Sequence, residues 1–158
     1  MKKEIERKFL IKSLPNLTGI EAEEQERYFL ELGEIEKRIT KIDNRYVCEE
    51  KTKGNGLTAE KVVKEISIDE FEELKSKSLF KIVRKNYILA KNLSIKMYVD
   101  KFDGLVRAEF EFGNEDEAKS FIPPNWVGRE ITETDLGRDG KLVQITRGVF
   151  LKMLNNYK

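Results

Sequence analysis

Acidic and basic side chains alternate with apolar ones near the start of the chain. In residues 4–11, EIERKFLI, an extended strand would place Glu4, Glu6 and Lys8 on one face, because successive side chains of a strand point to opposite faces. The same period places Glu109 and Glu111 side by side in 105–112. If these rows were enclosed, they would need compensating cations, either from side chains or from a bound hard metal such as Mg²⁺ or Mn²⁺.

The alternation alone allows two arrangements of the sheet. In one, the polar face lies in water; in the other, the sheet closes and its polar face lines a cavity, while helices cover the apolar face. Two carboxylates two residues apart on a strand lie about 7 Å apart and repel by roughly 2 kcal/mol at an effective dielectric constant near 20. An enclosed cluster therefore requires partners, whereas an exposed one does not.

Composition limits the classes of function. The 158 residues predict a single domain, 1–158, and 30 Lys and Arg against 29 Asp and Glu give a net charge of +1, which argues against a general nucleic-acid binder. The absence of histidine and the single cysteine, Cys48, exclude a catalytic triad, a Cys-His pair and a zinc site built on these residues. The chain has no long apolar run and no signal-peptide pattern after Met1, so we expect a cytoplasmic protein without a membrane partner.

Two-residue alternation recurs along the chain and predicts the strands. Asp103-Gly104 predicts a hairpin turn between the last two of them. Ser67 and Asn114 are predicted helix caps, and a third helix is predicted from about Gly140. We therefore expect an α+β, mainly β fold with about eight antiparallel strands. The predicted strands are 3–11, 26–32, 35–42, 46–53, 60–66, 81–89, 94–102 and 105–112.

An ordered set of motifs resembles the CYTH domain, the family of triphosphate tunnel metalloenzymes. EIERKFL resembles the ExExK signature of that family. Further matches follow in family order: EKRI (36–39), KTKGNGLT (51–58), EIS (65–67), VDKFDGLVRAEFEF (99–112) and PPNWVGREIT (123–132). Relatives in this family include inorganic and thiamine triphosphatases, RNA triphosphatases and class IV adenylyl cyclases.

The resemblance implies a closed eight-stranded antiparallel β-barrel with helices packed on its outside and a charged tunnel within. It implies Mg²⁺ or Mn²⁺ as cofactor and a triphosphate-containing small molecule as partner, without nucleic acid, and it leaves a homodimer open. The implied metal ligands are Glu4, Glu6, Asp100, Glu109, Glu111 and Glu130. The implied triphosphate ligands are Lys8, Arg38, Lys51, Lys53 and Arg84, and the implied catalytic residues are Glu4, Glu6, Lys8 and Glu111.

The chain departs from the family pattern at several charged positions. Thr40, Ala59 and Asn86 stand where the family has arginines. Each such loss removes a charge-assisted contact worth about 1.5–3 kcal/mol. Lys61 and Val63 stand where the family has glutamates, with only Glu65 retained. Lys53, Lys61 and Arg107 are candidates to restore part of the positive charge.

These observations predict a metal-dependent hydrolase of inorganic triphosphate or of a small organic or nucleoside triphosphate. The missing arginines motivate an alternative, a noncatalytic module that binds polyphosphate or nucleotide. An adenylyl cyclase is a third, less favoured reading, because the histidine that often precedes ExExK in cyclase-type members is absent.

Overall fold

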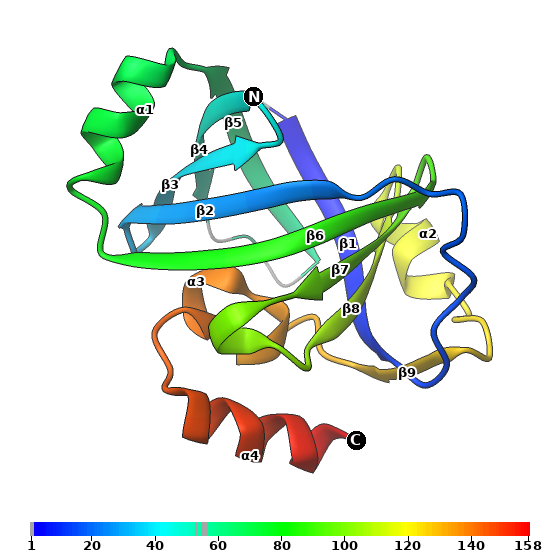
Figure 1. Cartoon of the computed structure of the whole chain (residues 1–158). Coiled ribbons are helices and arrows are strands. Elements are labelled where there is room, and N and C mark those ends of the chain that lie inside the picture. Colours follow the sequence, from blue (N-terminus) through cyan, green and yellow to red (C-terminus); the bar gives the residue numbers. More distant parts are fainter. Residues whose placement is uncertain (1, 53, 55–56) are drawn as a thin grey trace.

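The computed structural model describes residues 2–52, 54 and 57–158, and its centre is a closed barrel of eight antiparallel strands. The strand order is β5-β4-β3-β2-β6-β7-β8-β1, and pairing between β5 and β1 closes the ring (Figure 1). The strands are β1 (Lys2–Ile11), β2 (Glu23–Glu31), β3 (Ile35–Ile42), β4 (Arg45–Thr52), β5 (Thr58–Glu65), β6 (Phe80–Ala90), β7 (Leu93–Tyr98) and β8 (Val106–Glu111). This confirms the predicted fold class and the closed arrangement.

A ninth strand, β9 (Val127–Glu130), lies outside the ring. β5 pairs with the first part of β1, up to Ile5, and β9 pairs with Phe9 and Ile11 further along. Two strands therefore share one edge of β1, which leaves no long unpaired edge on that strand.

The apolar faces of the strands point outward and are covered by helices, as expected for a barrel with a polar interior. Helix α1 (Ile68–Lys75) buries Phe71 against Tyr28 and Ile39. Helix α2 (Glu115–Ser120) buries Ala118 and lies beside β1. The ring of Phe121, which follows α2, contacts the Phe9 ring. The outer face of the barrel is thus the part of the sheet that is stabilised by apolar burial.

Both predicted helix caps are confirmed. The Ser67 hydroxyl accepts a hydrogen bond from the Glu70 amide at 3.1 Å, and the Asn114 side-chain oxygen accepts one from the Glu117 amide at 2.8 Å. These bonds satisfy backbone donors that the first turn of a helix leaves without partners.

The largest apolar cluster closes one end of the barrel. Two short 3-10 turns, η1 (Asp100–Phe102) and η2 (Asp135–Gly137), and two helices, α3 (Asp139–Leu142) and α4 (Arg147–Tyr157), pack beneath the strands (Figure 1). The cluster consists of Leu10, Phe29, Ile82, Tyr98, Phe102, Leu105, Ile131, Leu136, Leu142, Val143, Phe150 and Leu154. No described helix is long and apolar enough to span a membrane.

Two sequence predictions about these segments were wrong in detail. The tail does not form one helix from Gly140, because Thr146 caps a separate helix through its hydroxyl, and Val149 is 48% exposed. The strand predicted over 94–102 ends at Tyr98. Asp100 then adopts a positive φ of 59° and begins η1, while the predicted turn at Gly104 is present with φ 107°.

Gly137 is a close-approach position, and its replacement tests how tightly the tail closes the barrel. A Cβ added to Gly137 would lie 2.0 Å from the Ile131 carbonyl oxygen, whereas one added to Gly148 meets nothing within 4 Å. We expect Gly137→Ala to lower the free energy of unfolding by about 2 kcal/mol or more, because backbone must move.

The matched control is Gly148→Ala in α4, which we expect to be neutral or to stabilise by up to about 1 kcal/mol, since alanine favours the helix. Urea denaturation measures both variants. Equal stability of the two would contradict the close packing of η2 against the barrel.

Candidate active site in the barrel

The barrel interior contains a cavity of about 230 Å³ with a positive lining. Among the described residues, ten lysines and arginines and six acidic residues line it, although the whole chain is nearly neutral. The basic lining residues are Lys8, Arg27, Arg38, Lys51, Lys61, Arg84, Lys96, Arg107, Arg138 and Lys141; the acidic ones are Glu4, Glu6, Glu36, Glu109, Glu111 and Asp139. An enclosed excess of positive charge is suited to a small polyanion.

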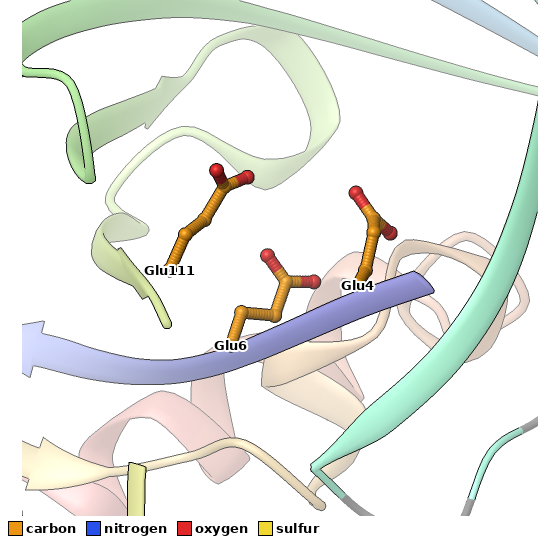
Figure 2. A group of neighbouring side chains, drawn as sticks. All are labelled: Glu4, Glu6 and Glu111. Atoms are coloured by element: carbon orange, nitrogen blue, oxygen red, sulfur yellow. The ribbon is translucent and has the colours of Figure 1, made fainter. Parts of the chain in front are cut away.

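Three carboxylates gather on one side of this cavity. Glu4 and Glu6 come from β1, and Glu111 comes from the end of β8, where it lies opposite Glu6 in the strand register. Each contributes an oxygen to a group in which all three atoms lie within 4.8 Å of one another (Figure 2). Opposite ligands of an octahedral Mg²⁺ are about 4.2 Å apart, so this all-oxygen set fits a hard divalent cation after a small adjustment.

Lysines form ion pairs with the two β1 carboxylates. Lys61 Nζ lies 2.9 Å and Lys51 Nζ 3.3 Å from Glu4 oxygens, and Lys8 Nζ lies 3.3 Å from Glu6. Burial alone would raise the pKa of Glu4, but Lys51 and Lys61 lower it to about 2. Burial lowers the pKa of Lys8, whose ammonium also donates to the Gly137 carbonyl at 2.8 Å.

Arg38 lies next to this group and is bound by two carboxylates. Its guanidinium forms ion pairs with Glu36 and, at 3.3 Å, with Glu49, which also accepts the Thr40 hydroxyl at 3.0 Å. The Nε–H groups of Arg38 and Arg27 are buried and have no hydrogen-bond partner in the described part of the chain. An anion entering the cavity would find these donors available.

A second ionic group surrounds Asp139, at the start of α3. The carboxylate lies 3.0 Å from Arg27, 2.9 Å from Arg84 and 3.3 Å from Arg107, and it accepts the Tyr98 hydroxyl. Burial would raise the pKa of Asp139, but the arginines hold it well below its usual range. Asp139 is therefore a fixed negative charge in the cavity wall.

Glu109 lines the cavity but lies among cations, apart from the three-carboxylate group. Arg107 is 2.6 Å from its carboxylate, and Lys96 is 3.9 Å away. Burial, offset in part by Glu109, lowers the pKa of Lys96 to about 8. The role of Glu109 as a metal ligand stays a prediction, since its present partner is the Arg107 guanidinium.

The structure brings together most, but not all, of the residues predicted from sequence. Lys8, Arg38, Lys51 and Arg84 line the cavity, while Lys53 lies outside the described residues. The remaining exceptions are two of the expected metal ligands.

Asp100 and Glu130 do not line the cavity. Asp100 is exposed because β7 ends before it, which breaks the alternation that would have turned it inward. Glu130 lies opposite Phe9, on the outer face of β1, and binds the Arg7 guanidinium at 2.7 Å. Neither carboxylate joins the group formed by Glu4, Glu6 and Glu111, and the assignment of both residues to the metal site stays a prediction.

Sequence reasoning missed several charged residues of the interior, among them Arg27, Lys96, Glu49 and Asp139. Arg27 and Lys96 sit on predicted strands, and Lys96 shares the strand phase expected for Asp100, so alternation alone could have found both. Glu49 gave the same signal on β4. Asp139 gave none, because it lies at the start of a short helix.

Other cationic residues partly replace the positive charge of the missing family arginines. Arg27 lies directly opposite Thr40 in the β2–β3 register, and its guanidinium enters the cavity. Lys61 and Arg107, the candidates identified from sequence, also line it. The interior thus retains many cations, although at other positions.

Acid titration tests the ion pairs of Glu4. Because its folded pKa is depressed from 4.5 to about 2, its stabilising contribution is present above pH 4.5 and is lost as the pH falls toward 2. The contribution is at most about 3 kcal/mol. We expect Glu4→Gln to be less stable than the parent at pH 6 and the gap to narrow by pH 2.5. Urea denaturation with a chelator measures this; a gap independent of pH would contradict the assignment.

Comparison with known proteins gives matches of sequence and of fold. An inorganic triphosphatase from Nitrosomonas europaea is 32% identical over 136 residues, which cover 82% of this chain and 89% of that protein. The crystal structure of an inorganic triphosphatase superposes with a TM-score of 0.65 at 24% identity, covering 89% of this chain and 97% of that one. A hypothetical protein from Pyrococcus furiosus shares the fold with a TM-score of 0.55 at 22% identity, covering 73% and 83%.

No protein-family model matches the sequence. The identity and coverage of the Nitrosomonas relative, together with the shared barrel, are nevertheless sufficient for a family assignment. The chain belongs to the CYTH, or triphosphate tunnel metalloenzyme, family.

Proposed function

We propose that the protein is a metal-dependent triphosphatase that hydrolyses inorganic triphosphate or a small organic or nucleoside triphosphate inside the barrel. The observation that carries this proposal is the meeting of three carboxylate oxygens, within 4.8 Å of one another, with a predominantly cationic lining in one cavity. The inorganic triphosphatase relative favours inorganic triphosphate within this class.

The cationic lining suits the charge of the substrate. A triphosphate carries about four negative charges near neutral pH, so several fixed cations must contact it. Lys8, Arg38, Lys51 and Lys61 each lie against a carboxylate at present. Phosphate oxygens would share these cations with their carboxylates and would take up the unpartnered Nε–H groups of the arginines.

Glu4, Glu6 and Glu111 are the residues that would hold Mg²⁺ or Mn²⁺. A divalent cation bound there supplies neutralisation of the charge on phosphate oxygens and on the leaving group. The protein residues bind and orient the phosphate chain, and Lys8, held between Glu6 and the Gly137 carbonyl, keeps its ammonium fixed in the cavity. Positioning and charge neutralisation account for most of the catalysis in this kind of phosphoryl transfer.

The setting of the reaction follows from the same properties. We expect the protein to act on small molecules and not on nucleic acid, because its net charge is close to zero. We expect it to act in the cytoplasm, because a chain with a single cysteine cannot form an intramolecular disulfide. The cavity lining carries more cationic than acidic residues, which favours an anionic ligand small enough to enter the cavity.

Phosphate release tests the proposed activity. With triphosphate and Mg²⁺ or Mn²⁺ we expect turnover that Glu111→Gln lowers by about 100-fold in kcat/KM, because the metal loses one of three ligands, a loss of roughly 2.7 kcal/mol. The matched control is Asp103→Asn, which changes an exposed carboxylate outside the cavity and should retain parental turnover.

The parent protein could instead release no more phosphate than Glu111→Gln while it still binds triphosphate. That result would contradict the hydrolase and favour a noncatalytic binding module. Cyclic AMP formed from ATP would instead favour a cyclase.

Separate binding measurements test the division between metal and phosphate ligands. Lys8→Met should weaken triphosphate binding without metal by about tenfold or more, because a charge-assisted contact is lost, and should change Mn²⁺ affinity less. Glu111→Gln should do the reverse. Calorimetry with each ligand alone measures both, and similar small effects of the two variants would contradict the assigned roles.

A further inference from the structure

Asp139 occupies the cavity wall in the way that a bound anion would. Its two oxygens contact three guanidinium groups, those of Arg27, Arg84 and Arg107, and the Tyr98 hydroxyl. Convergence of several guanidinium groups on two oxygens is the usual environment of a phosphate or a carboxylate ligand. Here the chain itself supplies that anion.

The site has an outer and an inner part that differ in burial. The carboxylate group of the outer part contains the exposed side chain of Glu111, and the Lys51 side chain beside it is 24% exposed. In the inner part, Arg107 is 1% exposed and Asp139 is 5% exposed. Both groups line the same cavity, so a phosphate chain held at the three carboxylates comes closer to Asp139 if it lengthens into the inner part.

The Asp139 carboxylate is buried and paired with three arginines, and the segment that carries it packs against its neighbours. A Cβ added to the next residue, Gly140, would lie 1.9 Å from a Glu36 oxygen and 3.4 Å from the Leu32 side chain. On the other side, Gly137 lies against the Ile131 carbonyl. The negative charge is thus held in place on both sides, so a substrate must accommodate it.

We propose that Asp139 limits the length of the phosphate chain that the tunnel accepts, by placing a fixed negative charge where the far end of a longer chain would lie. This inference rests on the proposed function, since it concerns the substrate of the same cavity. Asp139 acts here as a specificity-determining residue that neutralises the inner arginines and repels additional phosphate groups.

The size of the effect follows from Coulomb interaction. The interaction energy between two charges in the cavity is inversely proportional to the distance between them. The repulsion from Asp139 therefore acts most strongly on the phosphate nearest to it. A short chain held at the outer carboxylates escapes most of this repulsion, whereas a longer chain does not.

The test compares binding of pyrophosphate, triphosphate and tetrapolyphosphate to the intact protein by calorimetry, with a chelator to prevent turnover. Asp139→Asn keeps the shape of the side chain and removes its charge. We expect its affinity gain over the parent to rise with chain length, from about threefold or less for pyrophosphate to tenfold or more for tetrapolyphosphate. Asp139→Glu, which retains the charge, should keep the parental order.

The matched control is Asp135→Asn, in η2. It removes the same charge from the same segment but does not line the cavity, so it should leave the length dependence unchanged. A gain in Asp139→Asn that is equal for all three ligands, or no gain, would overturn the inference. If Asp139 had only a structural role, the substitution would change the affinity for all three ligands equally.

A second variant keeps the test decisive if Asp139→Asn does not fold. Gln144 is exposed, lines the same cavity, and donates to the Gly140 carbonyl at 2.7 Å. Gln144→Glu adds a negative charge at this end and should weaken tetrapolyphosphate binding more than pyrophosphate binding. Equal weakening of the two ligands would contradict the charge mechanism.

These binding data, taken together with the phosphate-release assay, separate this inference from the proposed function. If the parent shows no phosphate release but the length-dependent gain is present, hydrolysis fails while the charge mechanism holds. If the parent hydrolyses triphosphate and Asp139→Asn gains the same affinity for all three ligands, the hydrolase is supported and the charge mechanism is wrong. Absence of binding by every variant would overturn the charge mechanism as well.

Discussion

Charge balance inside a closed barrel is the constraint on which this structure depends. Carboxylates removed from water are costly unless cations lie within reach, and the interior meets this condition with shared pairs. Glu49 lies between Arg38, Lys61 and Arg27, and Asp139 between three arginines. Removing one partner would leave a buried charge without compensation, so these ion pairs depend on one another.

This polar interior moves the apolar core to unusual places. The barrel strands turn their hydrophobic faces outward to α1 and α2, and the largest cluster lies at the end of the barrel under α3 and α4. Most of the apolar burial therefore lies in a shell and a base outside the barrel interior, and the base contacts the site through the Tyr98 hydroxyl, which donates to Asp139. Such a separation allows interior charges to be exchanged, as Thr40 and Arg27 illustrate, without loss of the outer packing.

The sequence was informative wherever a strand kept its two-residue period. That period predicted which charged side chains share the inward face: Glu4, Glu6 and Lys8 on one strand, and Glu109 and Glu111 on another. Local hydrogen-bonding preferences predicted the helix caps Ser67 and Asn114. Closure of the sheet did not follow from it, because an open sheet has the same alternation; that expectation came from the family motifs.

The failures of prediction have particular physical causes. Asp100 was misplaced because nothing in the alternation showed that β7 would end at Tyr98 with a left-handed residue two positions later. Glu130 was misplaced because β9 pairs outside the ring. Asp139 could not be found at all, because its contacts join segments about 30 to more than 100 residues apart, and only the folded tail creates them.

The position of Asp139 in the chain has a consequence for biosynthesis. All eight barrel strands leave the ribosome before the segment 135–142 that supplies this carboxylate. Until that segment docks, Arg27, Arg84 and Arg107 repel one another without their shared counterion, and the base of the barrel is uncovered. The charge balance of the barrel interior is therefore completed only after the tail has been synthesised and has docked.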